Sequence, residues 1–324
     1  MRTKMKREKA MGVRPRNDEP TVRRAPLGPE ILKRLYYSML KCRMADEQAR
    51  RFVQEGKLTG TCNCESGPEA LVAGATLELL PEDTVVPGRW YFPLGVVRGA
   101  SLSLLYAQQL AHSRSPNPAA LAAVATQPLN MISPALTMTA QLNVGTGVAL
   151  AYRLQKRDNI VMAFSDSASS SPSPWHESVQ FAAAQRLPII FVLNSLNGTK
   201  DEATGQRIRS IAEPCGVPAI PVDGNDAIAV YRVCHEARVR ARQGYGPTIV
   251  EAKAVCLRSS RTNGAGRSSR KPGTERMASD PICSLEQYLR RHELFEEEWR
   301  QQITTKIARE ITESAAGGTN FSRS

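Results

Sequence analysis

The stretch AFSDSASSSPSPWHESVQFAAAQRLPIIFVLNSLNG, residues 163–198, decides the fold of this chain. It contains the ends of two short apolar segments, each closing in a small polar cluster, with a helical segment between them. The first cluster contains Asp166 and the second contains Asn194, 28 positions further along. A right-handed strand–helix–strand crossover makes the two strands parallel and adjacent, and it brings both polar ends to the same edge of a sheet.

The same alternation of strands and helices continues on both sides of this stretch. We expect helices at 142–157, 174–186 and 225–243, and strands at 159–164, 189–193, 219–222 and 248–254. Strands that are apolar throughout indicate a parallel sheet with helices on both faces, so the predicted fold class is α/β. Ligands of such sheets bind outside the carboxyl ends of the strands.

The first third of the chain is predicted to be mainly helical. Residues 29–56 carry apolar side chains near a 3.6-residue period and end at a glycine, which is typical of a long amphipathic helix. A second helix is expected in GPEALVAGATLELLPED, with Pro68 at its first position and its end before Pro81. Residues 113–134 are rich in proline, serine and alanine and favour an irregular loop.

Composition limits the class of protein. With 41% hydrophobic and 23% charged residues, the 324-residue chain is not disordered as a whole, and its apolar runs are too short to cross a membrane. The seven cysteines are odd in number and scattered, which favours a reducing, cytoplasmic location. Cys62 and Cys64 lack the further ligands that a zinc site needs.

The net charge of +12 is concentrated at the N-terminus, where residues 1–28 hold nine Lys and Arg but only three acidic residues. We interpret 1–28 as a basic, disordered tail, 29–312 as the folded domain and 313–324 as a disordered C-terminal tail. A nucleic-acid-binding arm is the alternative for 1–28, but no aromatic residues alternate with its charges, so we expect no nucleic-acid partner.

Asp166 and Asn194 together suggest a metal site. Mg²⁺ prefers carboxylate, amide and carbonyl oxygens combined with the phosphate oxygens of a ligand. The alternative is that both residues simply form the turns that end their strands.

The frame around the two clusters resembles the alpha subunit of thiamine-diphosphate-dependent 2-oxo acid dehydrogenases of the pyruvate and branched-chain type. Further segments resemble the same family in order over residues 30–312: LKRLYYSMLKCRMADEQ, GPEALVAG, AQLNVGTGVALAY, VDGNDAIAVY, GYGPTIVEA and SDPICSLEQYL. The resemblance implies the thiamine-diphosphate-binding fold, bound thiamine diphosphate and Mg²⁺, and a heterotetramer with a beta subunit. The implied reaction is oxidative decarboxylation of a 2-oxo acid with acyl transfer to a lipoyl group on the acyltransferase core of the complex.

The match departs from the family where the cofactor is held. The family's Gly-Asp-Gly is Ser165-Asp166-Ser167, and the serines crowd a phosphate that glycines admit. The metal ligands implied by the match are Asp166, Ser195 in place of the family's second asparagine, and the carbonyl of Asn197, although a one-residue slip would let Asn194 serve instead.

Further departures remove the groups that the family uses to hold diphosphate and substrate. Asn63 stands at a family histidine, and Arg89, Trp90 and Phe92 replace Tyr, Arg and His of the diphosphate-gripping segment. The family's His-Gly-His-Ser loop is Arg-Ser-Ser-Arg at 258–261. The residues implied to face the cofactor are therefore Ser165, Asp166, Ser167, Asn194, Arg89 and Asn63. Of the four histidines only His176 matches a family position, where helix packing explains it as well as catalysis does, and we assign no catalytic residue.

Two functions follow from this pattern. The first is an alpha-subunit-like member of the family that is weakly active or inactive. The second is a non-catalytic interaction or regulatory protein that keeps the fold to bind a beta subunit or a dehydrogenase complex, or to associate with itself.

Overall fold

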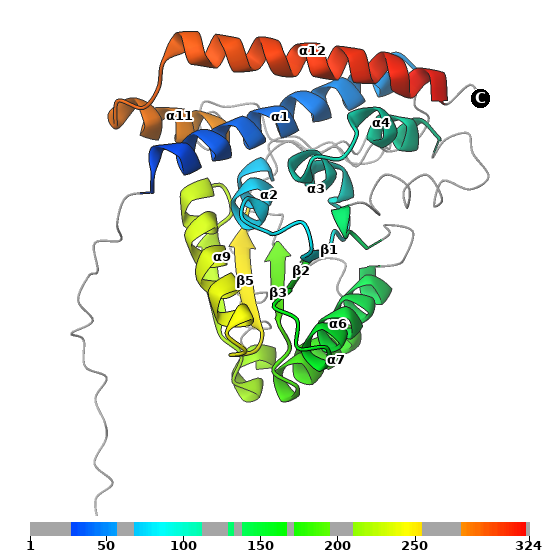
Figure 1. Ribbon diagram of the computed structural model, residues 1–324, viewed down its shortest axis with the longest axis vertical. Coiled ribbons are helices and arrows are strands. Elements are labelled where there is room, and N and C mark those ends of the chain that lie inside the picture. The colour runs from blue at the N-terminus through cyan, green and yellow to red at the C-terminus, as the bar shows by residue number, and fades with distance from the viewer. Residues whose placement is uncertain are drawn as a thin grey trace, which may run out of the picture.

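A five-stranded parallel sheet forms the centre of the molecule (Figure 1). The structure, a computed structural model, describes residues 27–56, 68–111, 129–132, 138–166, 172–194, 210–254 and 280–321. The strands lie in the order β1-β2-β3-β5-β4 and span Thr84–Val86 (β1), Val161–Asp166 (β2), Ile189–Asn194 (β3), Ala219–Asp223 (β4) and Thr248–Lys253 (β5). The predicted parallel sheet, with the second and third strands adjacent, is confirmed.

Helices cover both faces of the sheet, as the apolar strands predicted. All six residues of β3 are buried; Ile190 and Val192 join the core cluster beneath α2 (Glu69–Thr76) and α9 (Ala227–Arg242), whereas Ile189 and Phe191 join the cluster beneath α6 (Met138–Leu154) and α7 (Pro172–Ala184). Successive residues of a strand point to opposite faces, so a strand buried on both sides is apolar throughout.

A capping side chain sets the start of α9, and a glycine sets how closely α6 packs on the sheet. Asp226 precedes α9 and accepts hydrogen bonds from the backbone N–H groups of Ile228 and Ala229, which would otherwise lack partners. On α6, a Cβ at Gly145 would collide with the Cγ2 of Val86 on β1, so this helix can approach the sheet only through a glycine.

A second layer of helices lies across one end of the sheet (Figure 1). It consists of α1 (Pro29–Gln54), α3 (Tyr91–Arg98), α4 (Leu102–Ala111), α11 (Pro281–Arg291) and α12 (Glu297–Phe321). The long helix α12 packs along α4 and α1, and its Ile307 and Ile311 are buried there. The amphipathic helix expected at 29–56 is α1, whose Leu32, Leu35 and Met39 are buried.

Several boundaries differ from the sequence-based expectation. The strand expected at 159–164 starts and ends two residues later, so Asp166 is its last residue. The helix expected to reach Pro81 ends at Thr76, and Pro68 precedes α2 instead of opening it. The three-residue strand β1 was not predicted. Most of the loop expected at 113–134 lies outside the described residues.

The division of the chain at residue 312 was wrong. We expected 313–324 to be a disordered tail, but α12 continues to Phe321. Ala315 is buried, and Gly317 lies so close to Ser103 on α4 that an added Cβ would be 3.1 Å from the Ser103 hydroxyl. Tertiary packing against α4 therefore overrides the weak helix propensity of the paired glycines.

Residues 1–26 of the basic tail lie outside the described residues. Among the helices of the described ranges, none combines the length and hydrophobicity that a membrane span requires.

Candidate functional site

The carboxyl edge of the sheet brings the two polar clusters together. Asp166 at the end of β2 is in register with Asn194 at the end of β3, and Asn194 is in register with Ala252 on β5. The sequence-based prediction that both clusters share one edge is confirmed. The register places the two backbones side by side, and a side-chain contact of Asp166 with Asn194 or Ser195 stays a prediction.

The amide of Asn194 is the most unusual polar group at this edge. Its side chain is 0% exposed, and within the described part of the chain neither Oδ1 nor Nδ2 has a hydrogen-bond partner. By strand alternation it lies on the same face as Ile190 and Val192. An unpaired buried amide costs on the order of 1–3 kcal/mol, so this position calls for a polar partner.

Of the other residues that the sequence predicted for the site, the structure describes the side chain of Ser165 but not those of five more. Ser165 is buried and alternates to the face of Val161 and Ala163, opposite to the Asn194 amide. Five candidates cannot be placed further, because the side chain of Asp166 and the whole of Asn63, Ser167, Ser195 and Asn197 lie outside the described residues.

Arg89 lies in the loop that joins β1 to α3, at the same edge of the sheet. The loop is anchored by the N–H of Gly88, which donates a hydrogen bond to the buried Gln141 Oε1 at 3.0 Å. Gly88 adopts a positive φ of 57°, which suits a glycine. Arg89 is half-buried and is the one described cation among the residues implied to hold the cofactor.

The three residues after Arg89 are part of the core. Trp90 is 2% exposed, and its indole packs edge-on against the Phe164 ring with centroids 5.9 Å apart. Phe92 is also 2% exposed and packs on Tyr106. Tyr91 is buried, and burial raises the pKa of its hydroxyl. Aromatic packing of this kind stabilises a core and leaves little polar surface for a phosphate.

A buried ion-pair cluster, which the sequence did not reveal, lies between α1, α2 and α11. Arg43 Nε donates to Glu69 Oε1 at 2.5 Å, and its Nη1 donates to Asp280 Oδ2 at 3.0 Å. Glu69 directly follows Pro68 at the start of α2, and Asp280 caps α11. Arg43 thus connects residues 26 and 237 positions away, a spacing that leaves no local sequence signal.

Asp46 belongs to the same cluster and has an altered acidity. Burial raises the pKa of its carboxyl to about 6, while the Arg50 guanidinium, 3.0 Å away, opposes this rise and nearby Glu69 adds to it. The neighbouring Cys42 is fully buried, and burial raises the pKa of its thiol. These groups lie at the junction of α1, α2 and α11.

Two further observations concern the described residues. His176 is exposed on α7, where it is free of the core. No group of three or more His, Cys, Asp or Glu side chains suited to a metal occurs in the ranges that the structure covers.

Comparison with known proteins agrees with the fold. Residues 36–320 match the family model described as dehydrogenase E1 component. The chain is 30% identical over 293 residues to the 2-oxoisovalerate dehydrogenase subunit alpha of Bacillus subtilis, which covers 86% of this chain and 88% of that protein. It is 28% identical over 230 residues to the pyruvate dehydrogenase E1 component subunit alpha of Staphylococcus aureus strain Mu50, covering 69% of this chain and 60% of the relative.

The chain belongs to the dehydrogenase E1 component family. Within this family it is similar to the alpha subunits of 2-oxo acid dehydrogenases, as the sequence motifs indicated. The family uses thiamine diphosphate, but the described residues do not fit a diphosphate well: the segment that should grip it is buried aromatic core, and Arg89 is its one cation.

Proposed function

We propose that this chain is an alpha-subunit-like member of the 2-oxo acid dehydrogenase family that is weakly active or inactive in oxidative decarboxylation. The observation that carries the proposal is the burial of Trp90, Tyr91 and Phe92 in the core at the edge where the family binds its cofactor. Their rings fill the core and none of them carries a charge, so they do not supply the charge-assisted hydrogen bonds of the arginine and histidine that they replace; the one buried donor without a partner among these three described residues is Trp90 Nε1–H.

The expected loss of affinity is large. A hydrogen bond to a charged group contributes about 1.5–3 kcal/mol, so two uncompensated losses weaken binding roughly a hundredfold or more. The serines at 165, 167 and 195 act in the same direction, because they replace the glycines and the amide of the family's motif. If a metal binds at all, we propose that it is Mg²⁺ held by Asp166, Ser195 and the Asn197 carbonyl, or by Asn194 after a one-residue slip.

A thermal-shift experiment tests the proposal. A ligand present at about 100 times its Kd would stabilise the protein by about 2.7 kcal/mol. We expect thiamine diphosphate with Mg²⁺ at about 10 µM, roughly ten times the micromolar Kd of a working site, to leave the melting temperature of the chain unchanged. A clear rise that Asp166→Ala abolishes would contradict the proposal, because it would demonstrate a working cofactor site.

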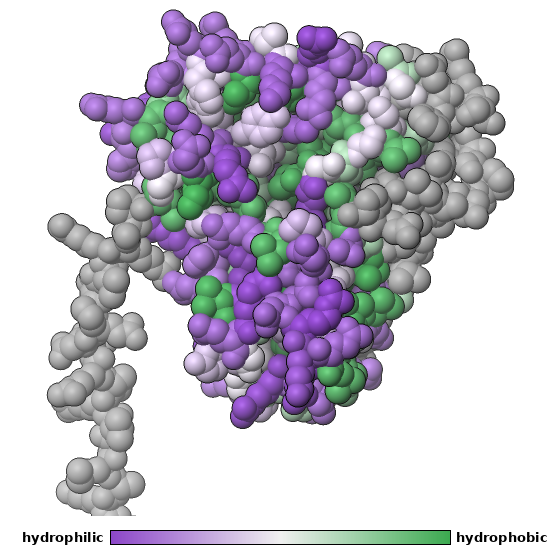
Figure 2. Space-filling model, viewed as in Figure 1, coloured by the Kyte–Doolittle hydropathy of each residue, from purple (hydrophilic) through white to green (hydrophobic). Residues whose placement is uncertain are grey.

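A non-catalytic binding role is the second candidate, and an exposed apolar surface favours it. Val144 on α6 and Phe181 on α7 are 41% and 43% exposed, and the two helices pack against each other. Figure 2 shows hydrophobic residues among polar ones on the side where these helices lie. Exposed apolar residues on neighbouring helices suit contact with another subunit.

We propose a beta subunit as the partner of this surface in a heterotetramer, with self-association as the alternative and the lipoyl acyltransferase core as a further contact. Light scattering on the chain expressed alone, at micromolar concentration, should detect a dimer or larger species. A stable monomer would argue against the binding role. A cytoplasmic location is our proposal from the cysteine pattern, and it agrees with the free thiols of the described Cys42, Cys215, Cys234 and Cys283.

A further inference from the structure

The amino edge of the sheet, opposite to the Asp166–Asn194 edge, is formed by the turns that lead from α6, α7 and α9 into β2, β3 and β5. In Figure 1 the arrows of β3 and β5 point towards the layer of α1 and α12, so this edge lies at the other end of the molecule from that layer. Figure 2 shows mainly hydrophilic residues at this lower end of the view. No step of the proposed function uses this edge.

Five cations gather at the amino edge without a carboxylate partner among the described residues. Four are exposed and the fifth, Arg240, is half-buried: Arg153, Lys156, Arg157, Arg186 and Arg240. The neighbouring Arg242, by contrast, pairs with the buried Asp83. The exposed carboxylates described near this edge, Glu82, Asp158 and Glu213, are fewer than the cations. The edge therefore presents an excess of positive charge to the solvent.

Contacts between the ends of α6 and α7 hold these cations close together. Arg153 in the last turn of α6 donates through Nη1 to Gln185 Oε1 at 2.8 Å, and Gln185 directly precedes Arg186. Arg157 donates through Nε to Asn159 Oδ1 at 2.9 Å, just before β2. Both acceptors are neutral side chains, so they leave the charge of each guanidinium uncompensated.

The end of α9 adds Arg240 and Tyr245 to the same surface. A Cβ at Gly246 would be 3.4 Å from the Cα of Arg186, so the turn before β5 lies against the turn before β3. Tyr245 directly precedes Gly246, and the Arg240 guanidinium is 5.6 Å from the centroid of the Tyr245 ring. We call this surface the amino-edge patch; it comprises the five cations together with Leu154 and Tyr245.

Two of the cations occupy backbone positions that favour glycine. Lys156 follows α6 with a φ of 55°, and Arg186 follows α7 with a φ of 45°. The matching position after α9 is Gly244, with a φ of 76°. A left-handed backbone is strained for a residue with a Cβ, so two helices keep a cation where the backbone favours glycine. Attraction between the cations and the carbonyl ends of the helices is the alternative explanation for these residues.

Apolar and acidic residues interrupt the positive charge of the patch. Leu154, which lies between Arg153 and Lys156 in the sequence, is 72% exposed, and Tyr245 is 64% exposed. Asp158 is exposed as well. The phosphate backbone of a nucleic acid gains nothing from a leucine and is repelled by an aspartate, whereas a protein segment can combine carboxylates with an apolar side chain. The patch therefore favours an acidic protein segment that carries an apolar residue.

We propose that the amino-edge patch docks an acidic segment of another protein, whose carboxylates pair with Arg153, Lys156 and Arg186 and whose apolar side chain covers Leu154. Val144, on the surface that we assign to subunit contact, lies ten residues earlier on α6, about 15 Å away along the helix. The amino-edge patch is thus a second surface, and its role does not depend on whether the chain is catalytic.

Glycine substitution separates docking from stability. Lys156→Gly with Arg186→Gly removes two charges and relaxes two strained backbone positions, so the melting temperature should stay the same or rise. The full-length chain should bind a fluorescein-labelled peptide of Glu-Glu-Leu repeats at low salt, and this double variant should weaken the binding about three- to tenfold in fluorescence anisotropy. A native chain that does not bind the peptide would overturn the proposal. A lower melting temperature with unchanged binding would assign the cations to the helix ends alone.

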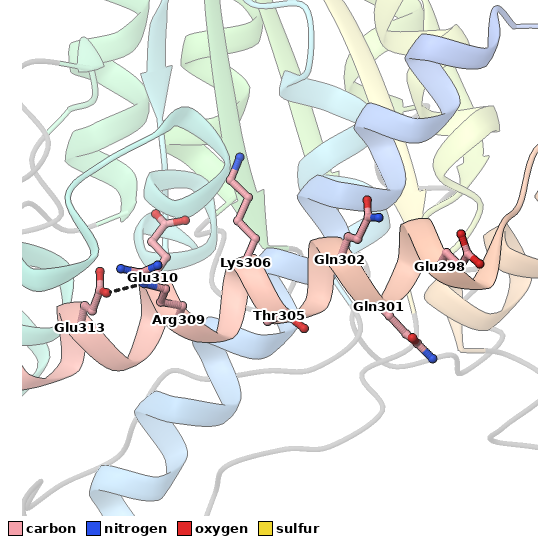
Figure 3. Close-up of a pocket in the computed structure, with 8 residues that line it drawn as sticks. All are labelled: Glu298, Gln301, Gln302, Thr305, Lys306, Arg309, Glu310 and Glu313. Carbon is pink, nitrogen blue, oxygen red and sulfur yellow. Dashed lines mark hydrogen bonds and ion pairs between the residues drawn. The ribbon is translucent and has the colours of Figure 1, made fainter.

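Two matched variants show whether the effect belongs to the patch. Glu293→Gly makes the same backbone change after α11, where Glu293 has a φ of 57°, and it should not weaken peptide binding. Lys306→Gln with Arg309→Gln removes two positive charges from α12, where both residues line a separate groove of about 730 Å³ (Figure 3). This double variant should change the affinity less than about twofold. A loss as large as that of the glycine double variant would overturn the assignment to the patch.

Competing ligands identify the kind of segment that binds. A peptide with serine in place of each leucine should bind more weakly, because Leu154 would lose its apolar contact. Equal binding of the two peptides would overturn that contact. An oligothymidylate that displaces the labelled peptide at a lower concentration than the unlabelled peptide does would overturn the choice of a protein segment.

Discussion

Two segments that meet at the carboxyl edge of the sheet differ in how far they keep the family's sequence pattern. Residues 140–152, which form most of α6, keep the family pattern and still pack through Gly145 on Val86. Residues 89–92, which the family resemblance places on the diphosphate, now bury Trp90 and Phe92 in the core. Gly88, which directly precedes the second segment, donates a hydrogen bond to Gln141 in the first. The difference supports our proposal that the framework is retained while residues 89–92 have become part of the core packing.

The largest expected effect comes from returning the family's arginine to position 90. Trp90→Arg should lower the free energy of unfolding by about 3–5 kcal/mol or more, because it removes a core indole and buries a charge beside Phe164. Urea unfolding measures this loss, and Trp90→Phe should lose less. A stable Trp90→Arg variant that binds thiamine diphosphate would reverse the comparison, since position 90 would then belong to a ligand site.

Substitution of Arg43 tests whether the ion-pair cluster stabilises the framework. Arg43→Met leaves the buried Glu69 carboxylate without its cation and should cost about 3–5 kcal/mol of unfolding free energy. Arg309→Met removes a pair with Glu313 that is largely exposed, and it should leave chemical denaturation unchanged within error. Equal effects of the two changes would contradict a structural role for the Arg43 cluster.

Asp46 adds a pH dependence to the same framework. Its folded-state pKa of about 6 lies above the ordinary value of 3.8, so the folded state holds this proton more tightly than the unfolded state. The free energy of unfolding should therefore fall as pH rises from about 4 to 6, by at most about 3 kcal/mol. Asp46→Asn should flatten this slope when denaturation curves are compared at each pH. An unchanged slope would assign the dependence to other groups.

A pair of glycines on α6 gives the smallest and most closely matched contrast. Gly145→Ala should destabilise the protein by about 1–3 kcal/mol, because the new methyl group collides with Val86. Gly147 has no neighbour within 4 Å of an added Cβ, so Gly147→Ala should stabilise α6 by about 0.5–1 kcal/mol. Melting temperatures should move in opposite directions. Two shifts of the same sign would show that close packing on β1 does not explain Gly145.

The parts of the fold that the sequence predicted depend on local patterns. The apolar runs of β2 and β3 predicted two parallel strands, and the handedness of the crossover predicted that Asp166 and Asn194 share an edge. The last turns of α12, after residue 312, were missed, because their stability comes from contact with α4 and not from their glycine-containing sequence. The three residues of β1 are too short for a periodicity.

The site was predictable only in its outline. The replacement of the family's diphosphate ligands at Arg89, Trp90 and Phe92 was visible in the sequence. The burial of Trp90 was not, because it depends on Phe164, which is distant in the chain. The Arg43 cluster was invisible for the same reason, since the partners of Arg43 on α1 lie at the starts of two other helices, α2 and α11.

The central claim is that the cofactor site is degraded while its frame is intact, and calorimetry tests it most directly. Thiamine diphosphate with Mg²⁺ should give no measurable heat with the native chain at concentrations of about 10 µM, as expected after a loss of roughly a hundredfold or more from micromolar affinity. Combining Ser195→Asn with Ser165→Gly and Ser167→Gly should recover part of the binding heat, because it restores the motif within a folded frame. Micromolar affinity in the native chain would contradict the claim and identify a working cofactor site.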